Sequence, residues 1–143
     1  MTEPADQTSL LLRSMPFAGV LGIEEVAAEP GRVTASLGWE PTRCTSGGVL
    51  HGGALMGLAD SLGGYCAFLN LPEGAAGTTT IESKTNFLRA VRGGRVTGTA
   101  RPLHVGRMII VVDTELRDDE GRLVARVTQT QAVLPRPGAD PNG

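Results

Sequence analysis

The chain has 143 residues, which is enough for one domain with a sizeable core but not for two. Its formal net charge is −2 and it holds no block of basic residues, so nucleic acid is not expected as a partner. The aromatic residues are too few to stack bases, and the start of the chain lacks a signal-peptide pattern, so the expected location is the cytoplasm.

Residues that bind metals or form disulfides are few and scattered. The histidines are His51 and His104, and Cys44 and Cys66 lack the spacing of metal ligands. We therefore expect two reduced thiols, no metal and no cofactor. No apolar run is long enough and poor enough in glycine to span a bilayer, so no contact with a membrane is expected.

The sequence predicts a single domain over residues 9–134. Residues 1–8 are predicted to be a flexible lead-in, and the proline-rich residues 135–143 a disordered tail. Residues 9–14 have the pattern of a short helix that ends before Pro16.

Most of the domain has the pattern of antiparallel strands. Pro30 and Gly31 form a turn between runs at 22–29 and 32–39, which predicts a hairpin. Four further strand-like runs follow later in the chain, at residues 77–88, 95–103, 107–117 and 122–134.

A long helix that starts at Gly52 is predicted between these two groups of strands. Its apolar residues recur every three or four positions, at Leu55, Leu58, Ala59, Leu62, Cys66 and Leu69. One helix with five or six antiparallel strands predicts an α+β fold in which the sheet wraps around the helix. Such a sheet leaves a convex face and edges to cover, so we expect a homo-oligomer.

Asp60 is the only charged residue of this predicted helix, and an ionised carboxylate in apolar surroundings is costly. Three of its four neighbours at helical spacing are Gly57, Gly63 and Gly64, although glycine inside a helix costs about 1 kcal/mol relative to alanine. We interpret these glycines as open space around a functional acid.

The helix start, His51-Gly52-Gly53, is suited to bind a carbonyl oxygen. The first N–H groups of a helix have no partner inside it, and glycine lets a ligand approach them. A carbonyl that becomes an oxyanion would be stabilised there, although a Gly-Gly pair also serves simply as a tight entry into a helix. Asp60 lies about 12 Å further along the axis. Because two groups that serve one carbonyl lie within about 3 Å of it, we expect Gly52 of one subunit to act with Asp60 of another.

These residues resemble a known family. Val49-Leu50-His51-Gly52-Gly53, followed by Leu58-Ala59-Asp60, is similar to the motif of the hotdog-fold acyl-CoA thioesterases of the phenylacetate-degradation (PaaI) type. The chain also resembles the 4-hydroxybenzoyl-CoA thioesterases that carry their acid on the central helix. The similarity covers roughly residues 17–134. It implies a hotdog fold, dimers that pair into tetramers, and hydrolysis of an acyl-CoA thioester.

The resemblance implies roles for single residues. Gly52 would polarise the thioester carbonyl through its N–H, and Asp60 would attack the carbonyl carbon or activate water. His51 would shape the helix start. Thr80 falls where relatives have a hydroxyl near the attacking water, and Thr45 stands where they usually carry Asn or Gln.

Further residues are expected to contact the acyl group or coenzyme A. They are Gly53, Met56, Gly64, Lys84, Arg89, Arg107 and Met108. Gly64 stands where the family often has Thr or Ser. The three cations are candidates for the CoA phosphates, and each also fits a solvated strand end.

The predicted function is therefore hydrolysis of an aromatic or medium-chain acyl-CoA, with coenzyme A present only as part of the substrate. Two alternatives remain open at this point. One is a non-catalytic module that binds or senses acyl-CoA on the same fold. The other is an enoyl-CoA hydratase or dehydratase that uses His51 together with Asp60.

Overall fold

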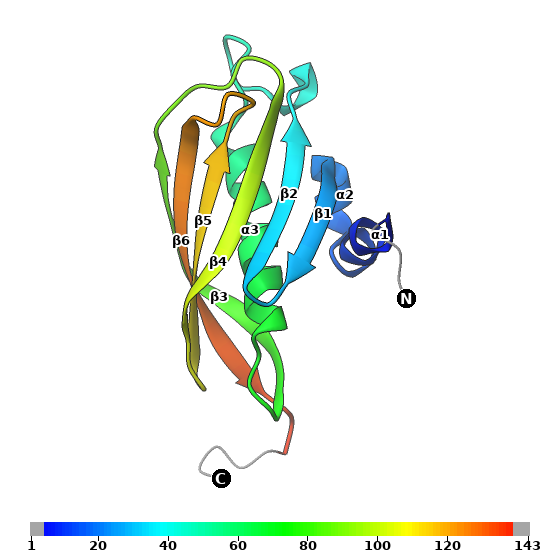
Figure 1. Ribbon diagram of the computed structural model, residues 1–143, viewed down its shortest axis with the longest axis vertical. Helices are drawn as coiled ribbons and strands as arrows, with labels where there is room; N and C mark the ends of the chain where they lie inside the picture. Colours follow the sequence, from blue (N-terminus) through cyan, green and yellow to red (C-terminus); the bar gives the residue numbers. More distant parts are fainter. Residues whose placement is uncertain (1–4, 139–143) are drawn as a thin grey trace.

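A computed structural model describes residues 5–138 of the chain, and in it one antiparallel sheet curls around a central helix (Figure 1). The helices are α1 (Ala5–Ser14), α2 (Pro16–Leu21) and α3 (Gly52–Leu69), with a short 3-10 turn at Pro41–Arg43. The strands are β1 (Ile23–Glu29), β2 (Arg32–Gly38), β3 (Ala75–Phe87), β4 (Arg95–Val105), β5 (Ile109–Arg117) and β6 (Leu123–Pro135). Their order in the sheet is β1-β2-β4-β5-β6-β3. The predicted α+β architecture is confirmed.

The core lies between α3 and the concave face of the sheet. The predicted apolar face of the helix is buried, and Leu58, Leu62 and Cys66 are fully enclosed. On β5 the alternation predicts one inward face, and Ile110, Val112, Thr114 and Leu116 are all 0% exposed. The helix packs tightly on the sheet at Gly98 of β4, where a Cβ atom would lie 2.5 Å from Leu62 Cδ1.

The edge of the sheet at β1 is covered by the N-terminal helices, and here the prediction of a flexible lead-in at residues 1–8 is wrong for residues 5–8. Helix α1 begins at Ala5 because polar side chains attach it to β1. The Gln7 amide makes two 3.1 Å hydrogen bonds with the backbone of Ala28, and the Val26 N–H donates to Thr8 Oγ1. Residues 1–4 lie outside the described part of the chain.

Two further boundaries differ from those expected. Pro16 does not only follow a helix but opens a second one, α2, because proline fits the first position of a helix. At the other end, Pro135 pairs with Ala75 and the Arg136 N–H donates to Gly74 O, so the sheet extends into the predicted tail. Residues 136–138 of the predicted tail are exposed and outside the strands, and residues 139–143 lie outside the described part of the chain.

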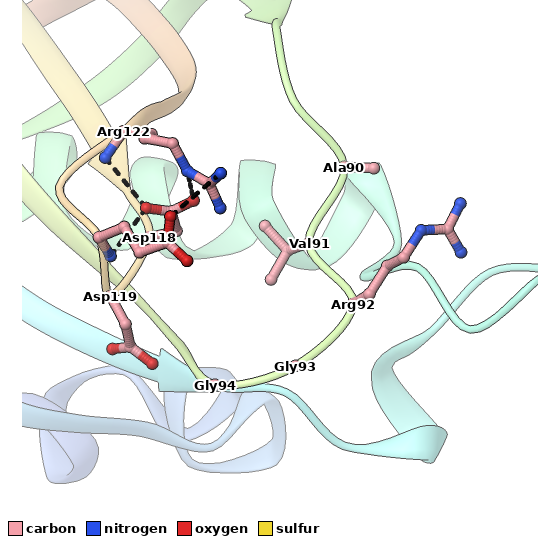
Figure 2. Close-up of a pocket in the computed structure, with 9 residues that line it drawn as sticks. Ala90, Val91, Arg92, Gly93, Gly94, Asp118, Asp119 and Arg122 are labelled. Atoms are coloured by element: carbon pink, nitrogen blue, oxygen red, sulfur yellow. Dashed lines mark hydrogen bonds and ion pairs between the residues drawn. The ribbon is translucent and has the colours of Figure 1, made fainter.

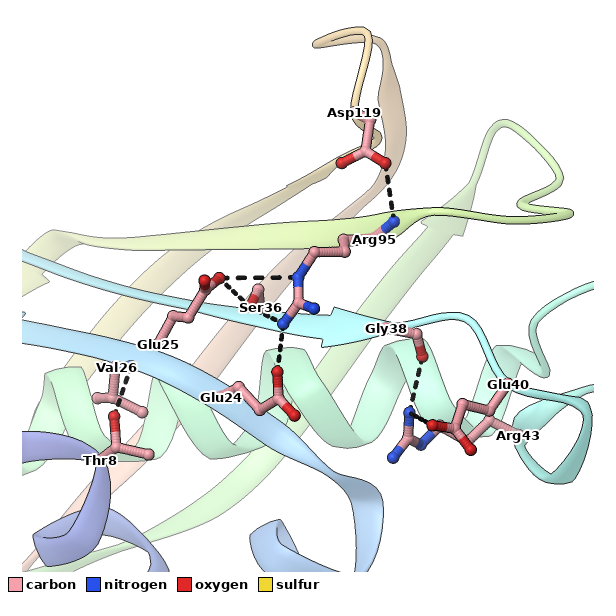
Figure 3. Close-up of polar contacts among 10 residues, drawn as sticks. All are labelled: Thr8, Glu24, Glu25, Val26, Ser36, Gly38, Glu40, Arg43, Arg95 and Asp119. Carbon is pink, nitrogen blue, oxygen red and sulfur yellow. Dashed lines mark hydrogen bonds and ion pairs between the residues drawn. The ribbon is translucent and has the colours of Figure 1, made fainter. Parts of the chain in front are cut away.

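A polar cluster on the outer face fastens β1 to the rest of the sheet (Figure 3). A β-bulge between Glu24 and Ala27 places Glu25 at a φ of 55°, in the left-handed region. Its carboxylate accepts a 2.6 Å hydrogen bond from Ser36 Oγ, and the Arg95 guanidinium of β4 pairs with both Glu24 and Glu25. The β1 edge is thus closed, whereas β3, at the other end of the sheet, pairs only with β6 within the chain.

Candidate active site

The N-terminus of α3 is held by its own histidine. His51 is the N-cap residue, and the Gly53 N–H donates to His51 Nδ1 at 2.7 Å. The Gly52 N–H has no hydrogen-bond partner among the residues that the structure describes. The helix start therefore leaves the N–H of Gly52, and not that of Gly53, for a ligand.

Packing also favours glycine at position 52. A Cβ atom at this position would lie 3.0 Å from Phe87 Cζ of β3, which is closer than ordinary van der Waals contact. The preceding loop is fixed by backbone hydrogen bonds, because Leu50 N donates to Val91 O and His51 N donates to Arg43 O, each at 2.9 Å. The helix start is thus built from several segments of the chain and packs beside the end of β3.

Asp60 lies in a different place, in a pocket of about 580 Å³ between α3, the N-terminal helices and strands β3 and β6. The pocket is lined by Ser14, Met15, Phe17, Ala18, Asp60, Ser61, Gly64, Tyr65, Phe68, Gly77, Thr78, Thr79, Thr80 and Gln131. Three of the five aromatic residues of the chain are among them. The pocket is therefore largely apolar, with a single carboxylate and a threonine-rich wall.

Two strands supply hydrogen bonds to the acid. Gln129 Nε2 of β6 donates to Asp60 Oδ1 at 2.6 Å, and the Thr80 hydroxyl of β3 also bonds to the carboxylate. Gln131 Nε2 in turn donates to Thr80 Oγ1 at 2.7 Å. Partial burial raises the pKa of the Asp60 carboxyl, and the bonds from Gln129 and Thr80 act in the opposite direction. The arrangement suits a partly buried base that hydrogen bonds hold in its ionised form.

The glycines around Asp60 have three different surroundings, so the expectation of open space is wrong for two of them. A Cβ atom at Gly57 would lie 2.6 Å from Leu21 Cδ1, because α2 packs there. A Cβ atom at Gly63 would overlap Gln129 Oε1. Only Gly64 faces open space, and it lines the pocket.

The predicted site residues fall into separate groups. Asp60, Thr80 and Gly64 share the pocket, whereas Gly52, Gly53, His51, Thr45 and Met56 do not line it. The remaining predicted contacts are exposed: Lys84 lies on β3, Arg89 follows that strand, and Arg107 and Met108 lie in the loop between β4 and β5. One chain thus carries the two halves of the expected site apart from each other, as their spacing on the helix predicts.

Sequence reasoning missed Gln129 and Gln131. Both are amides on the inner face of β6, where the alternation otherwise places Ala125 and Val127, and both are almost completely buried. The sequence contains a signal for both: they continue the alternate positions of β6 that face the core, and polar groups buried there need hydrogen-bond partners.

A second pocket, of about 400 Å³, lies between residues 90–94 and the β5–β6 turn (Figure 2). It contains neither Asp60 nor Gly52. Its three acids are all engaged. Arg122 pairs with Asp118 at 2.9 Å and with Glu120 at 3.1 Å. The Arg95 N–H donates to Asp119 Oδ2. This pocket therefore offers no free base.

Cysteine and metal chemistry find no support in the described part of the chain. Burial raises the pKa of the Cys66 thiol to about 11, so it is not a thiolate nucleophile at neutral pH. Both cysteines are free. No group of three metal-ligating side chains gathers among residues 5–138, and none of the helices there is long and apolar enough to cross a membrane.

One antiparallel sheet wrapped around a single central helix is the architecture of the hotdog fold. Residues 47–125 match the model of the thioesterase superfamily. The chain belongs to this family.

Individual relatives agree with this assignment. The chain is 36% identical over 119 residues to the esterase PA1618 of Pseudomonas aeruginosa, covering 83% of this chain and 82% of that one. It is 39% identical over 87 residues to the 1,4-dihydroxy-2-naphthoyl-CoA hydrolase of Escherichia coli, covering 61% and 63%. The crystal structure of the thioesterase HI1161 from Haemophilus influenzae superposes with a TM-score of 0.83 at 30% identity, covering 94% and 93%. The predicted hotdog fold and thioester hydrolase class are confirmed.

Proposed function

We propose that this protein hydrolyses an acyl-CoA thioester, with Asp60 as the catalytic carboxylate and the Gly52 N–H as the oxyanion donor. The observation that carries the proposal is the hydrogen-bonded Asp60 carboxylate, which lines a largely apolar pocket and is only partly shielded from solvent in the single chain. Such a carboxylate can take a proton from water or attack the thioester carbon itself. Gly52 supplies an N–H at a helix start, where negative charge on the carbonyl oxygen is stabilised.

A two-fold dimer would join the two halves of this site. The properties of strand β3 support such a dimer. The outer edge of β3 has no strand partner among residues 5–138, and Ile81, Phe87 and, directly after the strand, Leu88 are exposed. Exposed apolar edges of this kind are usually covered by another chain.

The same strand touches both half-sites. Thr80 lies beside Asp60, and Phe87 packs over Gly52. If β3 pairs antiparallel with its copy about a centre between these two residues, Thr80 of one chain faces Phe87 of the other. Asp60 then approaches the partner's Gly52. Pairing of such dimers into tetramers, as the family resemblance implies, is part of the same proposal.

The acyl group would occupy the pocket beside Asp60. Phe17, Tyr65 and Phe68 give it aromatic walls, and Gly64 leaves room next to the acid. A relative in Escherichia coli is a 1,4-dihydroxy-2-naphthoyl-CoA hydrolase. An aromatic acyl group therefore fits better than a medium aliphatic chain. The CoA phosphates would lie outside the pocket, on exposed cations such as Lys84, Arg89 and Arg107.

His51 supports hydrolysis over hydration. Its Nδ1 accepts the Gly53 N–H, so the imidazole serves as a helix cap in this arrangement. A hydratase that used His51 as a base would lose its activity on enoyl-CoA in His51→Ala. The proposed thioesterase would lose only part of its activity through a weakened helix start.

The test is turnover of a panel of benzoyl-, phenylacetyl- and octanoyl-CoA, read as free thiol with a dipyridyl disulfide dye. Asp60→Asn is expected to lower kcat by about 10²- to 10⁴-fold. Asp113→Asn is the matched control, because Asp113 pairs with Arg126 on the outer face and is expected to retain activity. Full activity of Asp60→Asn would refute the assignment, and binding of acyl-CoA by the wild type without thiol release would favour the non-catalytic alternative.

A further inference from the structure

Gln129 is the one side chain of β6 whose amide reaches the acid on α3. It is 0% exposed and stands 69 residues from Asp60 in the sequence, with 2.6 Å between its Nε2 and Asp60 Oδ1. A buried amide needs hydrogen-bond partners, so a glutamine in a core position is costly unless it has a task.

The helix is shaped to admit this amide. Gln129 Oε1 occupies the place where a side chain of residue 63 would begin, and only glycine leaves that place empty. The same oxygen is buried without a hydrogen-bond partner among the described residues. Two features of this arrangement are unfavourable in free energy: a glycine inside a helix and a buried oxygen without a partner. Together they allow Gln129 Nε2 to point toward the carboxylate.

The direction of the amide fits an ionised acid. A carboxylate has only acceptors, so it is matched by the N–H side of an amide and repelled by the oxygen side. The bond from Gln129 is made to Oδ1 of the carboxylate.

No cation replaces this interaction. The residues that line the pocket come from α1, the α1–α2 junction, α2, α3, β3 and β6, and among them Tyr65 is the only titratable group besides Asp60. Lys, Arg and His are absent from this lining. The partly buried carboxylate is therefore stabilised by the neutral groups Gln129 and Thr80, which lower its pKa.

We propose that Gln129 is a positioning residue for catalysis, which aims the Asp60 carboxylate and keeps it ionised, and that Gly63 exists to make room for it. This inference rests on the proposed function of Asp60. It assigns Gln129 no contact with substrate. Its effect passes entirely through the orientation and the protonation of the acid.

The test compares three variants by kcat, KM and the pH dependence of kcat/KM, with the acyl-CoA of the panel that the wild type hydrolyses best. Gln129→Met keeps the length of the side chain but removes the donor. Gly63→Ala leaves both Gln129 and Asp60 in place but forces them apart. Thr114→Val is the control, because it removes another buried polar group without a described partner, on the neighbouring strand β5.

Gln129→Met and Gly63→Ala are expected to move the acid limb of the pH profile upward by about one pH unit. They are expected to lower kcat roughly 10- to 100-fold with little change in KM, because the acid is misplaced but the acyl pocket is intact. Thr114→Val is expected to follow the wild type. If Gln129→Met is not obtained folded, Gly63→Ala alone carries the test.

The result that overturns the proposal is a wild-type pH profile and kcat in a folded Gln129→Met or Gly63→Ala variant. Asp60→Asn separates this failure from failure of the proposed function. If Asp60→Asn is inactive while Gln129→Met is unaffected, only the positioning role is refuted. If Asp60→Asn is fully active, the assignment of Asp60 itself is wrong.

Discussion

Replacement of Gly52 by proline would test the oxyanion donor by removing a single N–H group. Gly52 is the first residue of α3, a position where proline is favoured. The preceding His51 already has the extended backbone that proline requires, with φ −64° and ψ 135°. The cap between His51 and Gly53 does not use the deleted N–H. The helix is therefore expected to persist in Gly52→Pro.

The expected loss in kcat is about 10²- to 10³-fold, equivalent to about 3–4 kcal/mol of transition-state stabilisation. Gly52→Ala is the matched variant, since it places a Cβ atom 3.0 Å from Phe87 Cζ but keeps the N–H. Its loss measures the steric part alone and is expected to be much smaller. Equal activities of the proline and alanine variants would show that the N–H plays no part.

The same variant tests whether the site is shared between subunits. Gly52→Pro and Asp60→Asn chains, each nearly inactive, are refolded together from an equal mixture. About half of the resulting dimers contain one chain of each kind, and each of these has one intact site of two, so about a quarter of the wild-type activity should return. If the mixture stays as inactive as its parents although mixed dimers form, Gly52 and Asp60 do not act across the interface.

Three further outcomes follow from the structure. Asp60→Asn is expected to raise Tm at pH 7, because burial raises the pKa of Asp60 and the folded state therefore disfavours the charged form. This gain in Tm should vanish below about pH 4. A Tm equal to that of the wild type at pH 7 would contradict the expectation. Phe17→Ala is expected to raise the KM for an aromatic acyl-CoA about tenfold but to leave the KM for acetyl-CoA nearly unchanged, because only a large acyl group reaches the wall of the pocket formed by α2. Equal changes in KM for both substrates in steady-state kinetics would show that Phe17 does not contact the acyl group. Gly98→Ala is expected to destabilise the fold by about 1–3 kcal/mol in urea unfolding, since its Cβ atom would press on Leu62, and an unchanged midpoint would mean that the helix can move away from β4.

The regular elements could be predicted from the sequence because their signals are local. The three-and-four spacing of α3 and the two-residue period of β5 each follow from one stretch of chain, and the structure buries the expected faces. The separation of Gly52 from Asp60 could be worked out in the same way, from the rise of a helix.

The surroundings of Asp60 could not be predicted, because they depend on distant segments. The glycine pattern indicates that something approaches the helix, but not what. At Gly57 it is Leu21 from α2, and at Gly63 it is Gln129 from β6. The sequence likewise does not predict helix α1 at residues 5–8, because the side chains of Gln7 and Thr8 attach it to β1, which is distant in the sequence. Local composition predicts such a segment as loose when its contacts are formed in the fold.

The two edges of the sheet differ, and this limits how the molecule can assemble. At β1, the helix α1, the bulge and the ion pairs around Arg95 leave no free edge to which a strand of another molecule could pair. At the other end of the sheet, the outer edge of β3 has no strand partner among the described residues. A sheet that can grow from only one side stops growing once two copies have joined, since each uses up the other's free edge. The covered edge at β1 thus prevents open-ended polymerisation of a molecule whose other edge strand is unpaired.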